Sequence, residues 1–138
     1  MTGNDFVKFF LRTPLRIFMG DTMLITVTGR KTGKKYSTPV GYYREDGNLW
    51  VISNRNRTWW RNVIDGAKVT LLIKGKTMPA FAETVMDEKE VEKQIVEYVR
   101  HIPMSAKGLG IRVENHQPNA EDIARLAEEK LFVRIKTK

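Results

Sequence analysis

The stretch MLITVTGRKTGKKYSTPVGYYREDGNLWVIS, residues 23–53, decides the fold of this chain. It contains three runs rich in β-branched and aromatic residues, separated by GRKTGK and EDGN, which are typical of turns. β-Branched and aromatic side chains favour strands, and short glycine-containing turns reverse the chain between neighbouring strands. Residues 23–54 therefore predict three antiparallel strands.

The same alternation returns twice farther along the chain. AKVTLLIKGKTMPAFAETVM, residues 67–86, predicts a hairpin that turns at Gly75, and LFVRIKT, residues 131–137, predicts a last strand. The side chains expected to face inward are those of Val69, Leu71, Ile73, Leu131, Val133 and Ile135.

Helices are predicted between and after these strands. TWWRNVIDG, residues 58–66, has helical spacing and ends at a glycine. Asp87 and Glu90 form a capping box before a second helix, and Asn119 is placed to cap a third. Residues 103–118 contain several glycines and prolines and predict a long connection.

Residues 1–19 predict an amphipathic N-terminal helix. Phe6, Phe9 and Phe10 share one face of it, and Lys8 and Arg12 lie elsewhere. Two interpretations stay open: the helix lids the core, or it lies on a membrane surface.

These elements together predict one architecture. At 138 residues the chain fits a single domain, residues 1–138. Six strands in hairpin order with helices at the edges predict a mainly β (α+β) fold, a six-stranded antiparallel split β-barrel with peripheral helices.

The composition excludes several kinds of chemistry. The chain has no cysteine, which rules out disulfides, thiolate metal sites and a cysteine nucleophile, and with only two histidines a zinc site is not expected. It has no apolar run long enough to span a bilayer and no secretory pattern, so we expect a cytoplasmic protein. Contact of the N-terminal helix with the inner membrane face is the variant of this expectation.

The net charge of +8 is unevenly distributed. Residues 1–35 hold seven Lys and Arg against two acids, residues 53–76 hold six against one, and residues 83–97 hold six acids against two lysines. The basic segments predict an anionic partner, which can be a phosphorylated cofactor, a lipid surface or nucleic acid. No nucleic-acid-binding motif occurs, so we expect no nucleic acid.

The turn TGRKTGKK, residues 28–35, has the features of an anion site. Gly29 and Gly33 allow backbone conformations that aim N–H groups at one point, and four cations supply charge-assisted contacts. It is not a Walker loop, because the spacing is wrong and no helix follows. The alternative is a merely solvated turn.

The adjacent tryptophans of TWWRN form the second unusual feature. If Trp59 lies inward with Asn62 and Val63, Trp60 points toward a groove, a partner or a planar ligand. The alternative is that both tryptophans cover the open end of the barrel.

The run LITVTGRKTGKKYSTPVGYYREDGNLWVISN, followed by TWWRNVIDGAKVTLLIKG, resembles the deazaflavin-dependent nitroreductase and quinone reductase family. The resemblance covers residues 20–76, and its most specific parts are TGRKTG, the TP that follows, and WWRN. It implies a split-barrel fold similar to that of flavin mononucleotide (FMN)-binding oxidases. In that family the basic turn after the first strand holds the acidic tail of the coenzyme.

The resemblance implies a set of cofactor-binding residues. The tail-binding turn corresponds to residues 30–33, the second strand near the ring starts at Thr38, and the third strand ends at Ser53. Tyr36 stands where members usually have arginine, and SNRNRT is shorter than their loop after the third strand; Lys34, Lys35, Arg55 and Arg57 can replace the missing cations. The expected contacts are Arg30, Lys31, Thr32, Gly33, Lys35, Thr38, Pro39, Ser53, Asn54, Arg57, Trp59 and Asn62.

The implied activity is that of an oxidoreductase. The reduced deazaflavin coenzyme, coenzyme F420, would give a hydride to a quinone or nitroaromatic acceptor. Tyr42 and Tyr43 are the candidate catalytic residues that donate a proton or hydrogen bond, and at most one should face the pocket because they alternate across the strand. The fold also implies a homodimer.

Two other functions stay open at this point. The chain can be an FMN-binding relative, since fold alone does not choose between phosphorylated cofactors. It can also be a non-enzymatic barrel that binds a hydrophobic or anionic small molecule or a lipid surface.

Overall fold

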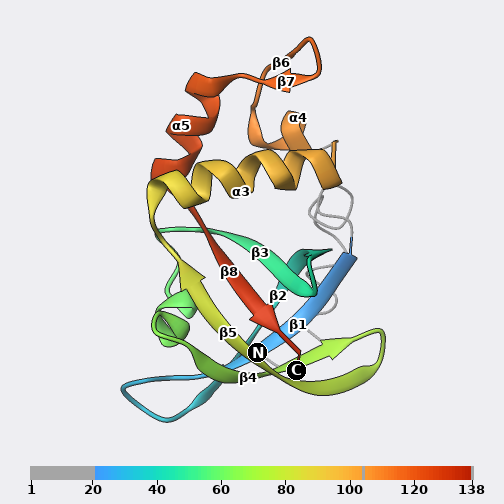
Figure 1. The fold of residues 1–138 in the computed structure, drawn as a ribbon. Helices are drawn as coiled ribbons and strands as arrows, with labels where there is room; N and C mark the ends of the chain where they lie inside the picture. Colours follow the sequence, from blue (N-terminus) through green and yellow to red (C-terminus); the bar gives the residue numbers. More distant parts are fainter. Residues whose placement is uncertain (1–20, 104, 138) are drawn as a thin grey trace.

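A computed structural model describes residues 21–103 and 105–137, and its centre is a closed barrel of antiparallel strands (Figure 1). The strands are β1 (Asp21–Thr28), β2 (Lys35–Glu45), β3 (Asn48–Asn54), β4 (Ala67–Ile73), β5 (Lys76–Val85) and β8 (Lys130–Lys136). Their order around the barrel is β1-β2-β3-β8-β5-β4, and β4 pairs with β1 to close it. The predicted fold class and its six barrel strands are confirmed.

Alternation along the strands fills the barrel interior. All six side chains expected to face inward from β4 and β8 are buried there, together with Met23, Ile25 and Val27 of β1. The turns between the first three strands fall where the sequence places glycine: Gly33 has φ +73° and Gly47 has φ +79°, values that glycine adopts without strain.

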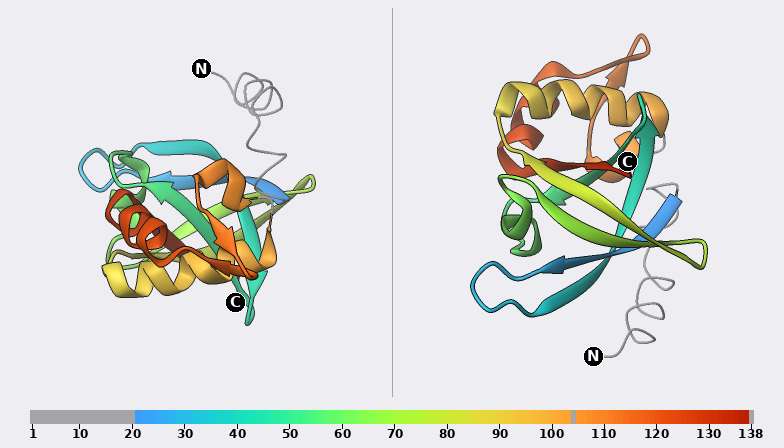
Figure 2. Two further views of the ribbon diagram at one scale, coloured as in Figure 1. Left: turned by 90° about the horizontal axis from the view of Figure 1, so that it is seen from above. Right: turned by 60° about the horizontal axis from the view of Figure 1, so that its bottom comes forward.

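A second apolar layer lies outside the barrel. The helices α3 (Glu88–His101), α4 (Ser105–Leu109) and α5 (Ala120–Glu129) group on one side of the barrel in both views of Figure 2. Val91 and Ile95 of α3 are buried there in one cluster with Trp50 of β3 and Phe132 of β8. These two strands therefore bury both faces, which explains their nearly continuous apolar sequences.

Both predicted caps are present. The Asp87 side chain accepts a hydrogen bond from Glu90 N at 3.1 Å, and Asn119 accepts one from Asp122 N at 3.0 Å. Each satisfies one of the backbone donors that the first turn of a helix leaves free.

The expectation of a long irregular connection at residues 103–118 is wrong in part. The described part of this segment contains α4 and a two-stranded ribbon, β6 (Val113–Glu114) and β7 (Gln117–Pro118). Asn115 and His116, both with positive φ, make its turn. Elements of five and two residues are too short to produce a periodic pattern, so the sequence gives no sign of them.

The predicted helix at residues 58–66 is a short 3-10 helix, η1 (Trp59–Val63), between β3 and β4. The predicted N-terminal helix, residues 1–19, lies outside the described residues. Within the part of the chain that is described, no helix is long and apolar enough to cross a membrane.

Candidate functional site

Two pockets open on either side of Trp59, where β2 begins, β3 ends and η1 follows. We call them the strand pocket, of about 260 Å³, and the turn pocket, of about 610 Å³. Trp59 lines both pockets. A single bound molecule can therefore reach from one pocket to the other past this ring.

The strand pocket brings together half of the predicted cofactor contacts. They are Thr38, Pro39, Ser53, Asn54, Arg57 and Trp59. The sequence prediction missed Ile52, Gly108 and Leu109 of α4, and Lys130 at the start of β8. The pocket thus has apolar walls on several sides and polar groups at the end of β3.

The turn pocket holds most of the others. The predicted residues that line it are Arg30, Lys31, Thr32, Trp59 and Asn62, and the missed ones include Tyr36 and Arg61. Gly33 and Lys35 belong to the same exposed turn but do not line either pocket. The pocket is walled by three cations, since Arg61 of η1 joins the two cations of the turn.

Hydrogen bonds fix the turn against η1. Arg30 N donates to Asn62 Oδ1 at 3.1 Å, and the Arg30 guanidinium donates to Arg61 O at 3.3 Å. Gly29 N donates to Lys34 O at 2.7 Å, and Gly33 N donates to Gly29 O at 2.9 Å. The pocket wall is therefore held in place from both sides.

These bonds correct one prediction. The sequence analysis expected the backbone N–H groups of the turn to point at an anion, but those of Gly29, Arg30 and Gly33 are occupied within the protein, as is that of Lys34, which donates to Thr32 Oγ1 at 3.2 Å. Anion binding in this pocket falls to the side chains. Gly29 is needed for another reason, because a Cβ there would lie 2.7 Å from Cε2 of Tyr36.

The two tryptophans differ from the expectation that Trp60 faces a ligand. Trp59 is buried except at the pockets, and its Nε1 donates to Ser53 Oγ at 3.2 Å. Trp60 is 5% exposed, and its Nε1 donates to Asn54 O at 3.2 Å. Trp60 packs into the barrel core, so the prediction that it points toward a groove is wrong.

Arg55 does not replace a missing phosphate contact. Its guanidinium donates to Ala127 O at 3.0 Å and to Met86 O at 2.8 Å. These carbonyls lie in the last turn of α5 and just before α3, so Arg55 fastens the helices to the barrel.

The candidate catalytic tyrosines lie away from both pockets. Tyr42 is 2% exposed in the barrel core, and Tyr43 is 6% exposed under α3, where its hydroxyl accepts a hydrogen bond from Gln94 Nε2. The Tyr43 ring stacks on His101 at a centroid distance of 5.0 Å. Strand alternation puts them on opposite faces as expected, but the strand pocket is lined by residues nearer the start of β2.

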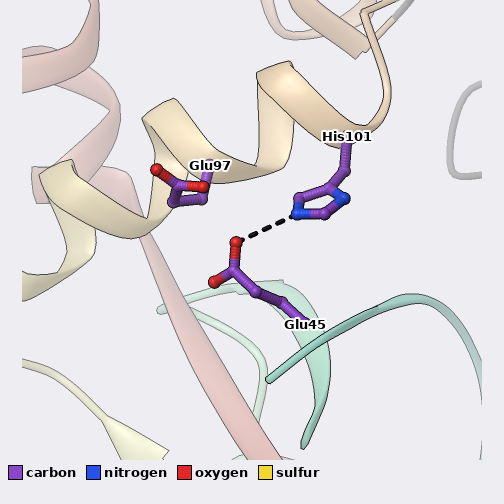
Figure 3. Close-up of side chains that lie close together, drawn as sticks. All are labelled: Glu45, Glu97 and His101. Atoms are coloured by element: carbon purple, nitrogen blue, oxygen red, sulfur yellow. Dashed lines mark hydrogen bonds and ion pairs between the residues drawn. The ribbon is translucent and has the colours of Figure 1, made fainter. Parts of the chain in front are cut away.

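Figure 3 shows a further cluster of titratable groups, Glu45 at the end of β2 with Glu97 and His101 on α3. Their ligand atoms lie within 4.8 Å of one another. His101 Nε2 lies 2.9 Å from Glu45 Oε2, and Arg100 pairs with Glu97 at 3.4 Å. Burial opposes ionisation of Glu45, but the contact with His101 outweighs it and lowers the pKa of Glu45. Each carboxylate thus has a basic partner, and the cluster fastens α3 to β2.

Comparison with known proteins gives a family and a fold. A family model described as F420H(2)-dependent quinone reductase matches residues 11–116. The FAD and heme binding protein from Mycobacterium smegmatis has a TM-score of 0.53 at 11% identity, over 93% of this chain and 66% of that one. A protein of unknown function from Agrobacterium tumefaciens has a TM-score of 0.56 at 16% identity, over 88% and 50%.

A third structure covers more of both chains. The FAD-binding protein from Mesorhizobium loti has a TM-score of 0.54 at 12% identity, over 100% of this chain and 91% of that one. Identities this low show a shared fold alone. The chain spans less than two thirds of the length of the Mycobacterium and Agrobacterium proteins.

Proposed function

Because this chain belongs to the F420H(2)-dependent quinone reductase family, we propose that it binds reduced coenzyme F420 across the strand and turn pockets and reduces a quinone. The match over residues 11–116 confirms the predicted family, whose name states the oxidoreductase class and the deazaflavin coenzyme. Binding across these two pockets is our inference from the geometry.

The observation that carries the proposal is the position of Trp59 as a wall common to both pockets. One pocket has apolar walls beside an indole ring, which suits a planar ring system. The other is walled by Arg30, Lys31 and Arg61, which suit phosphate and carboxylate groups. The residues present therefore fit a coenzyme with a planar head and an anionic tail.

Each wall has a separate task in this proposal. The cations of the turn pocket bind the tail, and the hydrogen bond from Trp59 to Ser53 fixes the indole that orients the ring. Leu109 and Ile52 exclude water from the strand pocket. When bound, the reduced deazaflavin supplies a hydride for the acceptor.

A binding experiment with paired variants tests the role of the turn. We expect Arg30→Ala together with Lys31→Ala to raise the coenzyme Kd on the order of 100-fold, because two charge-assisted contacts are lost. The melting temperature should hardly change, since both side chains are exposed. Equilibrium titration with coenzyme F420 and a thermal melt measure the two effects.

The matched control is Lys68→Ala together with Lys76→Ala, which removes the same charge from exposed positions on β4 and β5. An equal loss of affinity in both double variants would mean that total charge, and not the turn pocket, binds the coenzyme. Turnover with a quinone and with a nitroaromatic compound then identifies the acceptor.

Three finer expectations stay predictions. They are assembly as a homodimer, a cytoplasmic location, and membrane contact through residues 1–19.

A further inference from the structure

Reduction of a quinone needs a proton as well as a hydride, and the strand pocket limits where the proton comes from. Tyr42 and Tyr43 do not line this pocket. Of the described residues that do, only Arg57 and Lys130 titrate. An arginine keeps its proton throughout the range in which proteins are folded, which leaves Lys130.

Lys130 is held in this position by the barrel itself. It is the first residue of β8 and pairs with Asn54 across the ladder between β3 and β8. Its Nζ donates a hydrogen bond to Asn54 Oδ1, next to Ser53 in the pocket wall. A long, mobile side chain is thereby kept at the end of β3, beside the ring of Trp59.

The surroundings of Lys130 suit proton transfer. Its side chain is half-buried, and burial lowers its pKa, although nearby Glu129 acts in the opposite direction. A general acid works best when its pKa lies closer to the operating pH than that of an ordinary lysine. The shift is in the useful direction.

We propose that Lys130 is the catalytic residue that protonates the reduced acceptor in the strand pocket. This inference rests on the proposed function, which supplies the hydride and its electron pair. A quinone that has gained a hydride is a hydroquinone carrying one negative oxygen. An N–H bond of Lys130 breaks as an O–H bond forms on that oxygen, and the neutral amine regains a proton from water.

Three variants separate proton donation from charge and from structure. Lys130→Met removes both the charge and the proton, and Lys130→Arg keeps the charge but cannot release a proton. Lys136→Met removes an exposed lysine from the other end of the same strand. We expect kcat with a quinone to fall on the order of 100-fold in both Lys130 variants and to stay unchanged in Lys136→Met. Full activity of Lys130→Arg would overturn proton donation.

A second acceptor provides an internal control. A tetrazolium cation becomes neutral formazan by gaining a hydride alone, so its reduction needs no donated proton. We expect the ratio of quinone to tetrazolium turnover to fall in Lys130→Met. An equal loss with both acceptors would show that Lys130 only supports the pocket, and the proposal would be wrong.

A measurement without coenzyme tests the site independently of turnover. After reductive methylation with ¹³C-formaldehyde, the NMR signal of Lys130 should titrate at lower pH than that of Lys136 and should shift when a quinone is added. Absence of both effects would overturn the placement of Lys130 in the acceptor site. If the wild-type protein binds no coenzyme F420, the proposed function fails instead, whatever these signals show.

Discussion

Trp59 connects the two halves of the site at the scale of a single residue. Its indole lines both pockets, and its Nε1 bond to Ser53 fixes the ring to the end of β3. Asn62 reinforces this position, because its side chain donates to Trp59 O at 3.2 Å and accepts from Arg30 N. The ring, the turn and the short helix are therefore one hydrogen-bonded unit.

This placement predicts which tryptophan reports ligand binding. We expect Trp59→Phe to remove most of the quenching of tryptophan fluorescence by bound coenzyme, since quenching requires close contact. Trp60→Phe is the matched control and should keep the quenching, because Trp60 is buried in the core and does not line either pocket. Titration of the two variants decides the assignment, and loss of quenching in Trp60→Phe alone would contradict it.

Residues of the site were predictable from sequence where a local motif carries them. Thr38, Ser53 and Trp59 lie within one contiguous stretch, and all three line the strand pocket. Lys130 follows Asn54 by 76 positions, and only the register of β3 with β8 brings the two together. No local pattern could have identified it.

At the scale of elements, Asp122 fastens the chain between α4 and β6 to helix α5. It is 2% exposed, and it accepts hydrogen bonds from Arg112 N at 2.9 Å and from Arg112 Nε at 3.0 Å. Arg125 adds an ion pair at 3.4 Å. The Arg112 guanidinium lowers the pKa of Asp122 to about 2.

The Asp122 contacts predict how stability depends on pH. Because the folded pKa lies below the ordinary value of 3.8, the contribution of Asp122 is present above about pH 4 and is lost as the pH falls toward about 2. We expect Asp122→Asn to lower the melting temperature by several degrees at pH 7 and to have little effect near pH 2. Thermal melts across this range measure it, and a constant difference would refute the role of ionisation.

Element prediction succeeded where alternation is long and failed where elements are short. The strands β1 to β5 and β8 have seven or more residues each, which is enough to show a period of two. The ribbon of β6 and β7 and the helix α4 have no such length. The orientation of Trp60 was mispredicted because η1 closes the end of the barrel and buries both tryptophans.

At the scale of the whole molecule, the charge of the chain is divided between two places. The two basic stretches of the sequence meet in the turn pocket, through Arg30 and Lys31 from one and Arg61 from the other. The first turn of α3 is acidic, and this helix packs against the other outer layer. The net charge of +8 is therefore concentrated near one proposed binding site.

This concentration predicts a salt dependence. We expect the Kd for coenzyme F420 to rise roughly tenfold between about 0.05 M and about 0.5 M sodium chloride, because salt screens exposed charges. The Arg30→Ala, Lys31→Ala double variant should show a much smaller change. Equal salt dependence in the variant and the wild type would place the tail away from the turn.

The measurement that tests the central claim most directly is a parallel titration of the wild-type protein with coenzyme F420 and with FMN, followed by tryptophan fluorescence. The account predicts micromolar binding of coenzyme F420 at one site per chain and no comparable binding of FMN. Micromolar binding of FMN without binding of coenzyme F420, or binding of neither, would contradict it.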